Sequence, residues 1–142
     1  MKLTALLLAS MVFLVAPLDS RAGGHEGSIE TAIEDAYRAY VQDFIDNDFE
    51  GIASRFRLPA VFEAETPQIF QTRDDLIRFY KDAKANIQEG YSHSTLDSIE
   101  IRPITEQIYS ADVVYRRLDA DDEVIHRGRS WKMFLLSPYS NR

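Results

Sequence analysis

The residues of this chain best suited to proton transfer lie on a predicted strand near residues 92–101. His93 and Asp97 have the same parity as Ile99 and Ile101, so regular alternation would turn all four side chains toward one face. An imidazole that titrates near neutral pH suits a general acid or base. His93 and Asp97 would lie about 13 Å apart along the strand, too far for direct contact. We therefore predict His93 as the best proton-transfer candidate; the alternative is an ordinary surface or hydrogen-bonded core histidine.

A second group of potential ligands lies near the amino terminus, at Gly23-Gly24-His25. If the chain were cut after Ala22, the free amine, two amides and the His25 imidazole could bind copper(II) or nickel(II) in a square plane. The alternative is a flexible leader over residues 23–28. The histidines otherwise lie far apart and show no His-x-His or His-x-x-x-His spacing. We therefore expect no metal site in the folded part, and no cofactor.

Amphipathic helices are expected to position these residues. Apolar residues recur at intervals of three and four over 29–45, which predicts one long helix with a buried stripe. A shorter helix is predicted over 49–56, and an apolar extended run follows at 58–62.

A further helix is predicted to follow Thr72. Thr72 and Asp75 resemble a capping box, in which each residue satisfies a backbone N–H of the other. A short strand is expected before it, at 68–71, and Gly90 is placed to end the helix in a left-handed conformation.

Three long strands are predicted to complete the fold, at 92–101, 106–118 and 123–136. Alternation along the last strand gives its two faces different residues. One face would carry His126, Ser130 and Lys132. The other would carry Arg127, Arg129 and Trp131.

This order of elements, with Tyr40-Val41 and the Asp48-Phe49-Glu50-Gly51-Ile52 turn leading to Phe56, resembles the nuclear transport factor 2-like superfamily. That superfamily includes ketosteroid isomerases, scytalone dehydratases and SnoaL-like polyketide cyclases. The resemblance covers most of residues 29–136. It implies an α+β, cone-shaped domain over 29–142, in which N-terminal helices pack on a curved, mainly antiparallel sheet.

The resemblance also implies one further strand after residue 136, where this chain has only the turn-rich residues 137–142. We therefore expect the last strand to be missing and the edge of the strand that ends at Leu136 to be unpaired. The alternative is a natural short form whose edge a partner subunit covers.

The resemblance places some catalytic groups and omits others. Tyr40 falls at the phenol position of ketosteroid isomerases, but their general-base position falls on Ala64, which cannot accept a proton. We therefore reject steroid isomerase chemistry. His93 matches a histidine of scytalone dehydratases, whose second histidine falls near Ala111 or Asp112, so Asp112 could serve as the proton acceptor.

In this superfamily the default ligand site is the cavity between helices and sheet. The residues expected to line it are aromatic: Tyr40, Phe44, Phe62, Phe79, Tyr115 and Trp131. Each of them could equally be an ordinary core residue, because aromatic side chains dominate core burial.

The first 22 residues have the layout of a signal peptide. Lys2 precedes an apolar segment over 3–17, and Ser20 and Ala22 fit a small-x-small cleavage site. The apolar segment is too short to span a bilayer. We therefore expect a secreted or periplasmic protein without a membrane anchor after cleavage. Loss of residues 1–22 changes the formal charge from −7 to −8, which argues against nucleic acid as a partner.

Together these features predict an exported domain, homodimeric through its sheet, that binds a small apolar or amphipathic molecule. The alternative is a cofactor-independent lyase or isomerase that uses His93 with Asp97 or Asp112 and Tyr40. A third possibility is a structural association domain. A buried, titrating histidine would favour the enzyme, a wide apolar cavity would favour binding, and a filled cavity would favour association.

Overall fold

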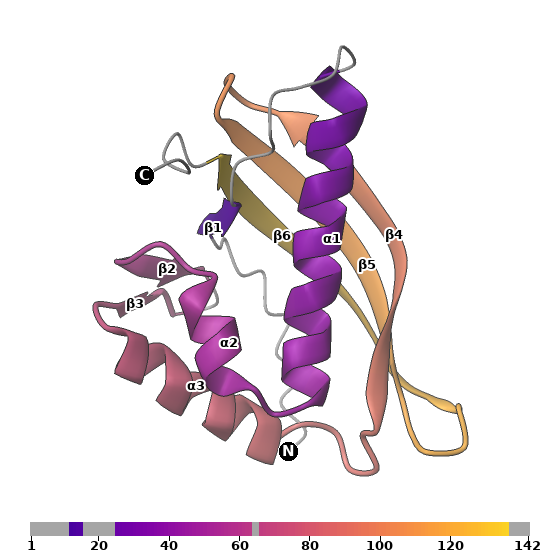
Figure 1. The fold of residues 1–142 in the computed structure, drawn as a ribbon. Helices are drawn as coiled ribbons and strands as arrows, with labels where there is room; N and C mark the ends of the chain where they lie inside the picture. Colours follow the sequence, from indigo (N-terminus) through magenta and orange to yellow (C-terminus); the bar gives the residue numbers. More distant parts are fainter. Residues whose placement is uncertain (1–11, 16–24, 64–65, 137–142) are drawn as a thin grey trace.

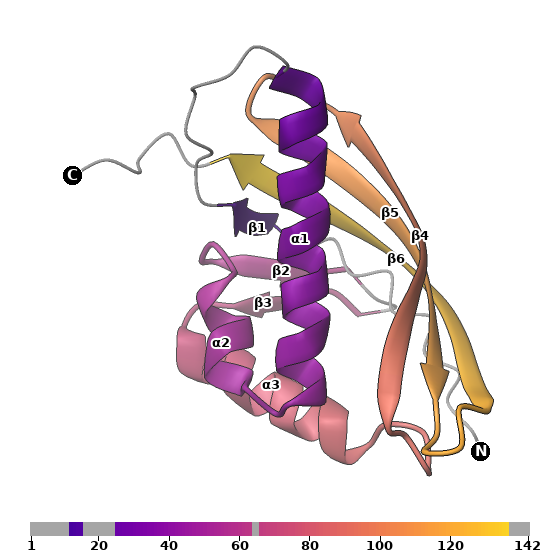
Figure 2. The same ribbon diagram turned by 45° about the vertical axis from the view of Figure 1, so that its right-hand side comes forward.

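A curved sheet packs against one long helix and two shorter ones in a computed structural model of the protein (Figure 1). The structure describes residues 12–15, 25–63 and 66–136. Its elements in chain order are β1 (Val12–Val15), α1 (His25–Ile45), α2 (Phe49–Ser54), β2 (Ala60–Phe62), β3 (Gln68–Phe70), α3 (Arg73–Ala85), β4 (His93–Pro103), β5 (Ile108–Leu118) and β6 (Val124–Leu136). Figure 2 shows all three helices on the same side of β4, β5 and β6.

The main sheet has the strand order β1-β6-β5-β4, and β2 and β3 form a separate antiparallel pair. β4, β5 and β6 are antiparallel neighbours, whereas β1 runs parallel to β6 and pairs Val12 with Met133. We predicted an unpaired edge on the strand that ends at Leu136. That prediction is wrong for the last four residues of β6, because β1 pairs with them. The further strand that the superfamily adds would fall on residues 137–142, outside the described residues.

The helices follow the predicted apolar spacing. α1 ends at Ile45 as predicted, but it begins at His25, before the predicted start at residue 29. The capping box at the start of α3 is confirmed. The Asp75 backbone N–H donates to Thr72 Oγ1 at 3.2 Å, and the Thr72 N–H donates to Asp75 Oδ2 at 3.2 Å.

The end of α3 differs from the prediction. The helix stops at Ala85, where the Asn86 side-chain amide donates to the Asp82 carbonyl at 2.8 Å. Gly90 does adopt a left-handed conformation, with φ +82°, but in the loop before β4. A polar side chain therefore caps α3, and the glycine instead allows a turn into the sheet.

The core lies between the helices and the face of the sheet that carries Ala111, Val113 and Phe134, here called the inner face. Its largest fully buried side chains are Phe56, Phe62, Phe134, Ile33, Ile52, Leu76 and Val113. Among the described residues, no helix is long and apolar enough to cross a bilayer.

Candidate functional site

A cavity of about 960 Å³ lies between α1, α3 and the inner face of β4, β5 and β6. Its volume is at the upper end of the range of about 300–1,000 Å³ that is typical of small-molecule sites. Part of its wall comes from Asp82, Asn86 and Glu89, which lie at the end of α3 and in the following loop and are exposed. The cavity therefore opens to solvent beside the end of α3.

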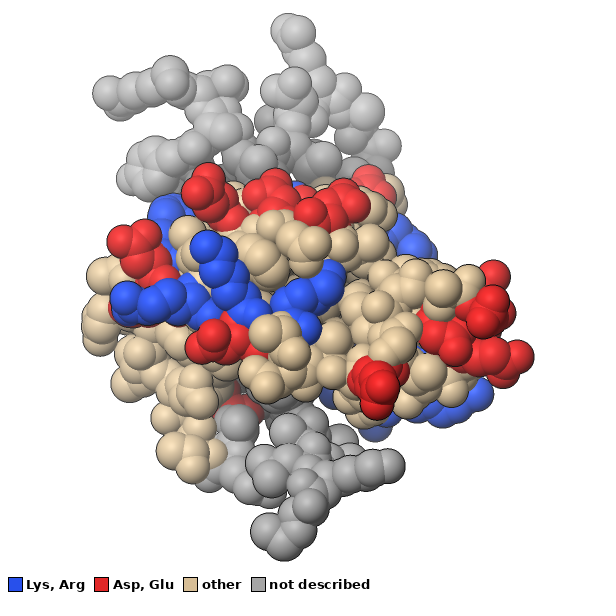
Figure 3. Space-filling model, turned by 90° about the horizontal axis from the view of Figure 1, so that it is seen from below, with Lys and Arg blue, Asp and Glu red and all other residues tan. Residues whose placement is uncertain are grey.

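The surface around that end of the molecule carries mixed charges. Figure 3 views the protein from the side on which α3 lies and shows acidic and basic side chains interspersed. A ligand that enters there does not meet a continuous field of one sign on the face that this view shows.

The helical wall of the cavity is aromatic. Its rings come from α1, β2 and α3: Tyr37, Tyr40, Phe44, Phe62, Phe79 and Tyr80. Phe62 meets Phe79 edge to face, with ring centroids 5.0 Å apart, and Tyr40 meets Tyr80 in the same way at 6.1 Å. Interlocked rings of this kind form a well-packed apolar surface.

Two phenols of this wall are paired. The Tyr40 and Tyr80 hydroxyl oxygens are 3.2 Å apart, so one donates to the other. Burial raises the pKa of Tyr40 to about 12 and raises the pKa of Tyr80 well above its ordinary value. Both phenols therefore stay protonated at neutral pH and act as hydrogen-bonding groups, not as bases.

The sheet wall of the cavity is more polar. Its polar and aromatic residues come from β5 and β6: Tyr115, Arg117, His126, Ser130 and Lys132. The Tyr115 ring lies directly against Gly128, where a Cβ atom would stand 2.3 Å from Tyr115 Cζ. Only glycine permits this close approach, so Gly128 leaves room for the ring in the wall.

Arg117 and His126 are neighbours near one end of this wall. Arg117 Nη1 donates to the Gln88 side-chain carbonyl at 2.7 Å. Burial, together with the nearby Arg117 charge, lowers the pKa of His126. The His126 imidazole is therefore mainly neutral at pH 7 and can both donate and accept a hydrogen bond.

Lys132 is the most deeply buried charged residue of this wall, with 3% of its surface exposed. Its Nζ lies 4.8 Å from the centroid of the Tyr40 ring and 5.8 Å from that of Tyr37. Burial lowers the pKa of Lys132 to about 7. The loss of hydration destabilises the charged form of Lys132, whereas the nearby tyrosine rings favour it by cation–π attraction.

Ser130 also lines the cavity, and its buried hydroxyl oxygen has no hydrogen-bond partner among the described residues. Burial raises the pKa of Tyr37, and the nearby Ser130 hydroxyl opposes part of that rise. The two groups do not meet the geometry of a hydrogen bond, so the Ser130 hydroxyl stays unsatisfied. Buried polar groups are normally paired, so a bound polar group at this point would be favoured.

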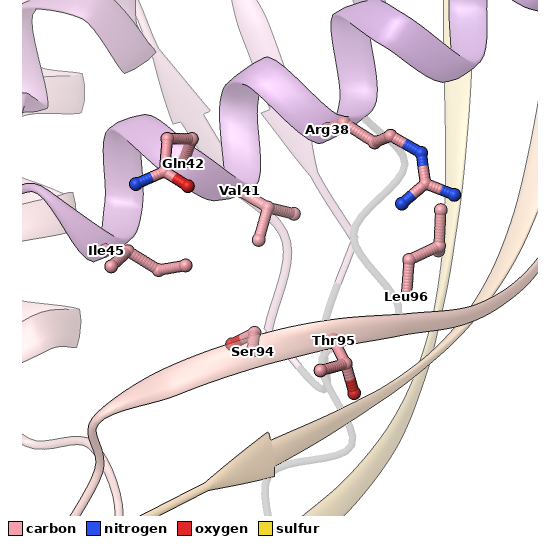
Figure 4. Close-up of a pocket in the computed structure, with 7 residues that line it drawn as sticks. All are labelled: Arg38, Val41, Gln42, Ile45, Ser94, Thr95 and Leu96. Atoms are coloured by element: carbon pink, nitrogen blue, oxygen red, sulfur yellow. The ribbon is translucent and has the colours of Figure 1, made fainter. Parts of the chain in front are cut away.

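A smaller pocket of about 420 Å³ adjoins the cavity between α1 and β4. Figure 4 shows Arg38, Val41, Gln42 and Ile45 on α1 above Ser94, Thr95 and Leu96 on β4. Four of these residues also line the larger cavity: Val41, Ser94, Thr95 and Leu96. The two spaces therefore share one stretch of wall.

A family model described as NTF2-like protein (DUF6841) matches residues 29–131. The chain belongs to this family. The match runs from α1 into β6 and so includes the elements that enclose the cavity. It confirms the superfamily and the α+β fold that the sequence predicted.

Solved structures of similar fold share little sequence with this NTF2-like chain. A domain of unknown function with a cystatin-like fold from Nostoc punctiforme is 17% identical, with TM-score 0.55 over 80% of this chain and 79% of that one. A putative aromatic ring hydroxylase from Novosphingobium aromaticivorans is 18% identical, with TM-score 0.54 over 82% and 95%. A Catenulispora acidiphila protein in complex with S-DNPA is 12% identical, with TM-score 0.57 over 78% and 95%. At these identities the likeness shows the fold alone, and no curated protein sequence matches.

Five of the six aromatic residues predicted for the cavity of this NTF2-like protein are in its wall: Tyr40, Phe44, Phe62, Phe79 and Tyr115. Trp131 is not among the residues that line it. Alternation along β6 buries Ser130 and Lys132 on the inner face and turns Trp131 to the outer face, opposite Asp112.

The structure does not turn His93 and Asp97 toward the cavity. The β4–β5 register shifts between Leu96 and Ser98, which inserts Asp97 as a bulge and reverses the parity of the strand. Ser94 and Leu96 therefore share the inner face with Ile99, and His93 does not line the cavity.

The predicted proton-transfer residues have other partners. His93 Nε2 lies 3.2 Å from Asp122 Oδ1, a carboxylate of the exposed β5–β6 turn. Asp97 accepts a hydrogen bond from Arg116 Nε at 2.7 Å. Both contacts lie outside the cavity wall, so these residues do not form a constellation with Tyr40.

Asp112 lies on the outer face, where Arg129 Nε donates to its Oδ1 at 2.7 Å. The hydrogen bond from Arg129 holds the pKa of Asp112 below its usual range. Asp112 is therefore an ionised member of a surface pair, and alternation along β5 separates it from the inner-face residue Val113.

The metal hypothesis concerned His25, which the structure places at the first residue of α1. Cleavage after Ala22 falls outside the described residues, so that site stays a prediction. Within the described ranges, no three histidine, aspartate or glutamate side chains gather closely enough to hold a metal ion.

The sequence predictions missed the polar groups of the sheet wall as site residues. Alternation along the last strand predicts Lys132 and Ser130 on the face opposite Arg129 but gives them no function. The sequence does contain an indication of their position. Ser130 and Lys132 alternate along the strand with Gly128 and Phe134, and Phe134 is buried. A lysine in such an inward-facing series is unusual, because lysine is almost never fully buried.

Proposed function

We propose that this protein binds a small amphipathic molecule in the cavity between its helices and its sheet. The observation that carries this proposal is a cavity of about 960 Å³ with an aromatic wall on one side and hydrogen-bonding groups on the other. An apolar body would lie against Phe44 and Phe79, while a polar end would reach the unsatisfied hydroxyl of Ser130. No bound cofactor is needed for this function.

The fold relatives support ligand binding in a general way. The Catenulispora protein, which has a similar fold, was solved in complex with S-DNPA. Because that protein is only 12% identical, the chemistry of the ligand has to come from the residues of this chain.

Binding can be tested with the neutral, environment-sensitive dye Nile red. Ala83 lines the cavity, so Ala83→Trp should fill part of it and weaken dye binding by at least about 10-fold. The matched control is Val114→Trp, which adds the same side chain to an exposed position of β5. Fluorescence titration and thermal shift should show dye binding to the wild type and to Val114→Trp.

Equal dye affinity in the two tryptophan variants would contradict the proposal, because the dye would then bind outside the cavity. Native mass spectrometry of the purified chain provides a second measurement. A co-purifying small molecule that is lost from Ala83→Trp but kept by Val114→Trp would identify the class of natural ligand.

A cofactor-independent lyase or isomerase is the second candidate. His93, Asp97 and Asp112 do not support it, because their partners lie outside the cavity. One observation favours a catalytic function with other residues: His126 and Lys132, two titratable groups, both line the cavity. His93→Gln should therefore leave any activity unchanged.

Export and self-association remain proposals that the sequence supports. Amino-terminal sequencing of protein recovered from an extracytoplasmic compartment would locate the cleavage site predicted after Ala22. Sedimentation equilibrium of that mature chain would determine whether it is a homodimer.

A further inference from the structure

Lys132 combines deep burial with access to the cavity. The residue is 3% exposed, yet it is one of those that line the cavity, on the inner face of β6. The Tyr40 ring lies 4.8 Å from its Nζ. The lysine is therefore shielded from bulk water in the wall of a cavity that opens beside the end of α3.

The other lysines of the folded part have different surroundings. Lys81 is an exposed residue of α3. Lys84 donates to the Phe44 and Ile45 carbonyls and so caps the carboxyl end of α1. Of the lysines in the described residues, only Lys132 lines the cavity.

We propose that the Lys132 amine forms a reversible imine with an aldehyde or ketone ligand whose apolar body occupies the cavity. This inference rests on the proposed function, because it assigns a chemical class to the molecule bound there. Lysines desolvated in apolar pockets are the usual source of such amine nucleophiles.

The step balances without an external reactant. The nitrogen lone pair attacks the carbonyl carbon and forms a carbinolamine. This addition product contains all the atoms of the amine and of the carbonyl compound. The nitrogen then loses a proton, the hydroxyl group gains one, and one molecule of water leaves as the C=N bond forms. Burial lowers the pKa of Lys132 to about 7, so about half of the amine carries its lone pair at neutral pH.

Hydroxyl groups near Lys132 can form hydrogen bonds with the oxygen of the carbinolamine. Ser130 lies two residues before Lys132 on the same face, and its hydroxyl has no hydrogen-bond partner among the described residues. The paired phenols of Tyr40 and Tyr80 also line the cavity and stay protonated. These groups can donate to the oxygen as it leaves.

Reductive trapping on the wild-type chain tests the proposal directly. The protein is incubated at pH 7 with benzaldehyde and sodium cyanoborohydride, and the benzylated lysines are mapped by peptide mass spectrometry. Lys132 should be labelled at least about 10-fold faster than Lys81, because an ordinary lysine is almost entirely protonated at this pH. Nile red should slow the labelling of Lys132 and leave that of Lys81 unchanged.

Two results would overturn the imine: equal labelling of Lys81, Lys84 and Lys132, or no labelling of Lys132. If Nile red still binds in the cavity in either case, the imine fails while the proposed binding function stands. Tight binding of 2-naphthoate without trapping of benzaldehyde would likewise overturn it, since Lys132 would then act as a cationic anchor for a carboxylate. Lys132→Arg keeps the charge and should abolish trapping at this site.

Discussion

Charged residues on the two faces of the same strands have pKa values shifted in opposite senses: the charged form is favoured on the outer face and disfavoured on the inner face. On the outer face, the partly exposed Asp112 and Arg129 form an ion pair, which lowers the pKa of the carboxyl and raises that of the guanidinium. On the inner face, Lys132 is buried against tyrosine rings, and its pKa falls. Pairing stabilises the charged forms outside, whereas burial destabilises the charged form inside.

This contrast shows that the face of a strand, more than the residue type, determines what a charged residue can do. Arg129 and Lys132 are close in sequence and both have basic side chains, but only Lys132 lines the cavity. The predictions that follow test the difference between the faces, beginning with the largest expected effect.

Adjacent valines of β5 should respond very differently to the same charge. Val113 is fully buried on the inner face, whereas Val114 is 38% exposed on the outer face. Val113→Asp should lower the free energy of unfolding by more than about 4 kcal/mol, because it buries an unpaired carboxylate. Val114→Asp should change it by less than about 0.5 kcal/mol. Urea unfolding of both variants measures the difference, and similar losses would contradict the assignment of the faces.

Replacing Lys132 by Met should change the pH dependence of stability. Between about pH 7 and pH 9.5, unfolded Lys132 is protonated while the folded amine is increasingly neutral, because its pKa is about 7. The unfolded state then binds more protons, so wild-type stability rises with pH by up to about 1.4 kcal/mol per unit. Lys132→Met lacks this contribution, so its advantage over the wild type should be largest at pH 7 and shrink toward pH 9.5.

Urea unfolding at several pH values provides that measurement. Lys81→Met is the matched control, because Lys81 is exposed and its removal should leave the slope unchanged. A constant difference between wild type and Lys132→Met across this range would show that Lys132 keeps an ordinary pKa in the folded protein.

Gly128→Ala should disturb the sheet wall to an intermediate extent. The new methyl group would stand 2.3 Å from Tyr115 Cζ, so the ring would have to move. We expect a loss of about 1–3 kcal/mol in the free energy of unfolding, together with weaker Nile red binding. In a Tyr115→Ala background the same change should cost much less, and a double-mutant cycle would detect this coupling. Additive effects would argue against the close contact.

Arg129→Ala should have the smallest effect. Its ion pair with Asp112 is on the outer face, and 69% of the Arg129 side chain is exposed. Such pairs contribute less than about 1 kcal/mol. Dye binding and benzaldehyde trapping should be unchanged, and the pKa of Asp112 should rise when followed by NMR titration. A loss of dye binding would contradict this prediction, because it would show that a residue of the outer face influences the cavity.

Much of the fold could be predicted because local patterns and tertiary packing agree. The spacing of apolar residues predicted α1, and the Thr72–Asp75 capping box located the start of α3. The long strands also lie within a few residues of their predicted bounds. The pairing of β1 with β6 could not be predicted in this way, because it joins segments far apart in the sequence.

The site was less predictable because the face on which a strand residue lies depends on unbroken alternation along that strand. One bulge at Asp97 was enough to remove His93 from the inner face. The aromatic residues of α1 and α3 were easier to assign, since helical periodicity continues through those segments. In the sequence, only the apolar residues near Lys132 indicate that it faces inward. Its low pKa results from burial, which cannot be read from the sequence.

The pairing of β1 with β6 has a consequence for the proposal that the chain is exported. If residues 1–22 are a cleaved leader, the segment Val12–Val15 has two competing fates: recognition by an export machinery, or incorporation into the sheet opposite Met133–Leu136. In a chain that folded before translocation, the pairing with β6 would therefore make part of the signal peptide inaccessible to the export machinery. Cleavage would also uncover the backbone N–H and C=O groups at that end of β6, which then require another strand. The order of folding and cleavage would thus determine which segment covers the end of the sheet.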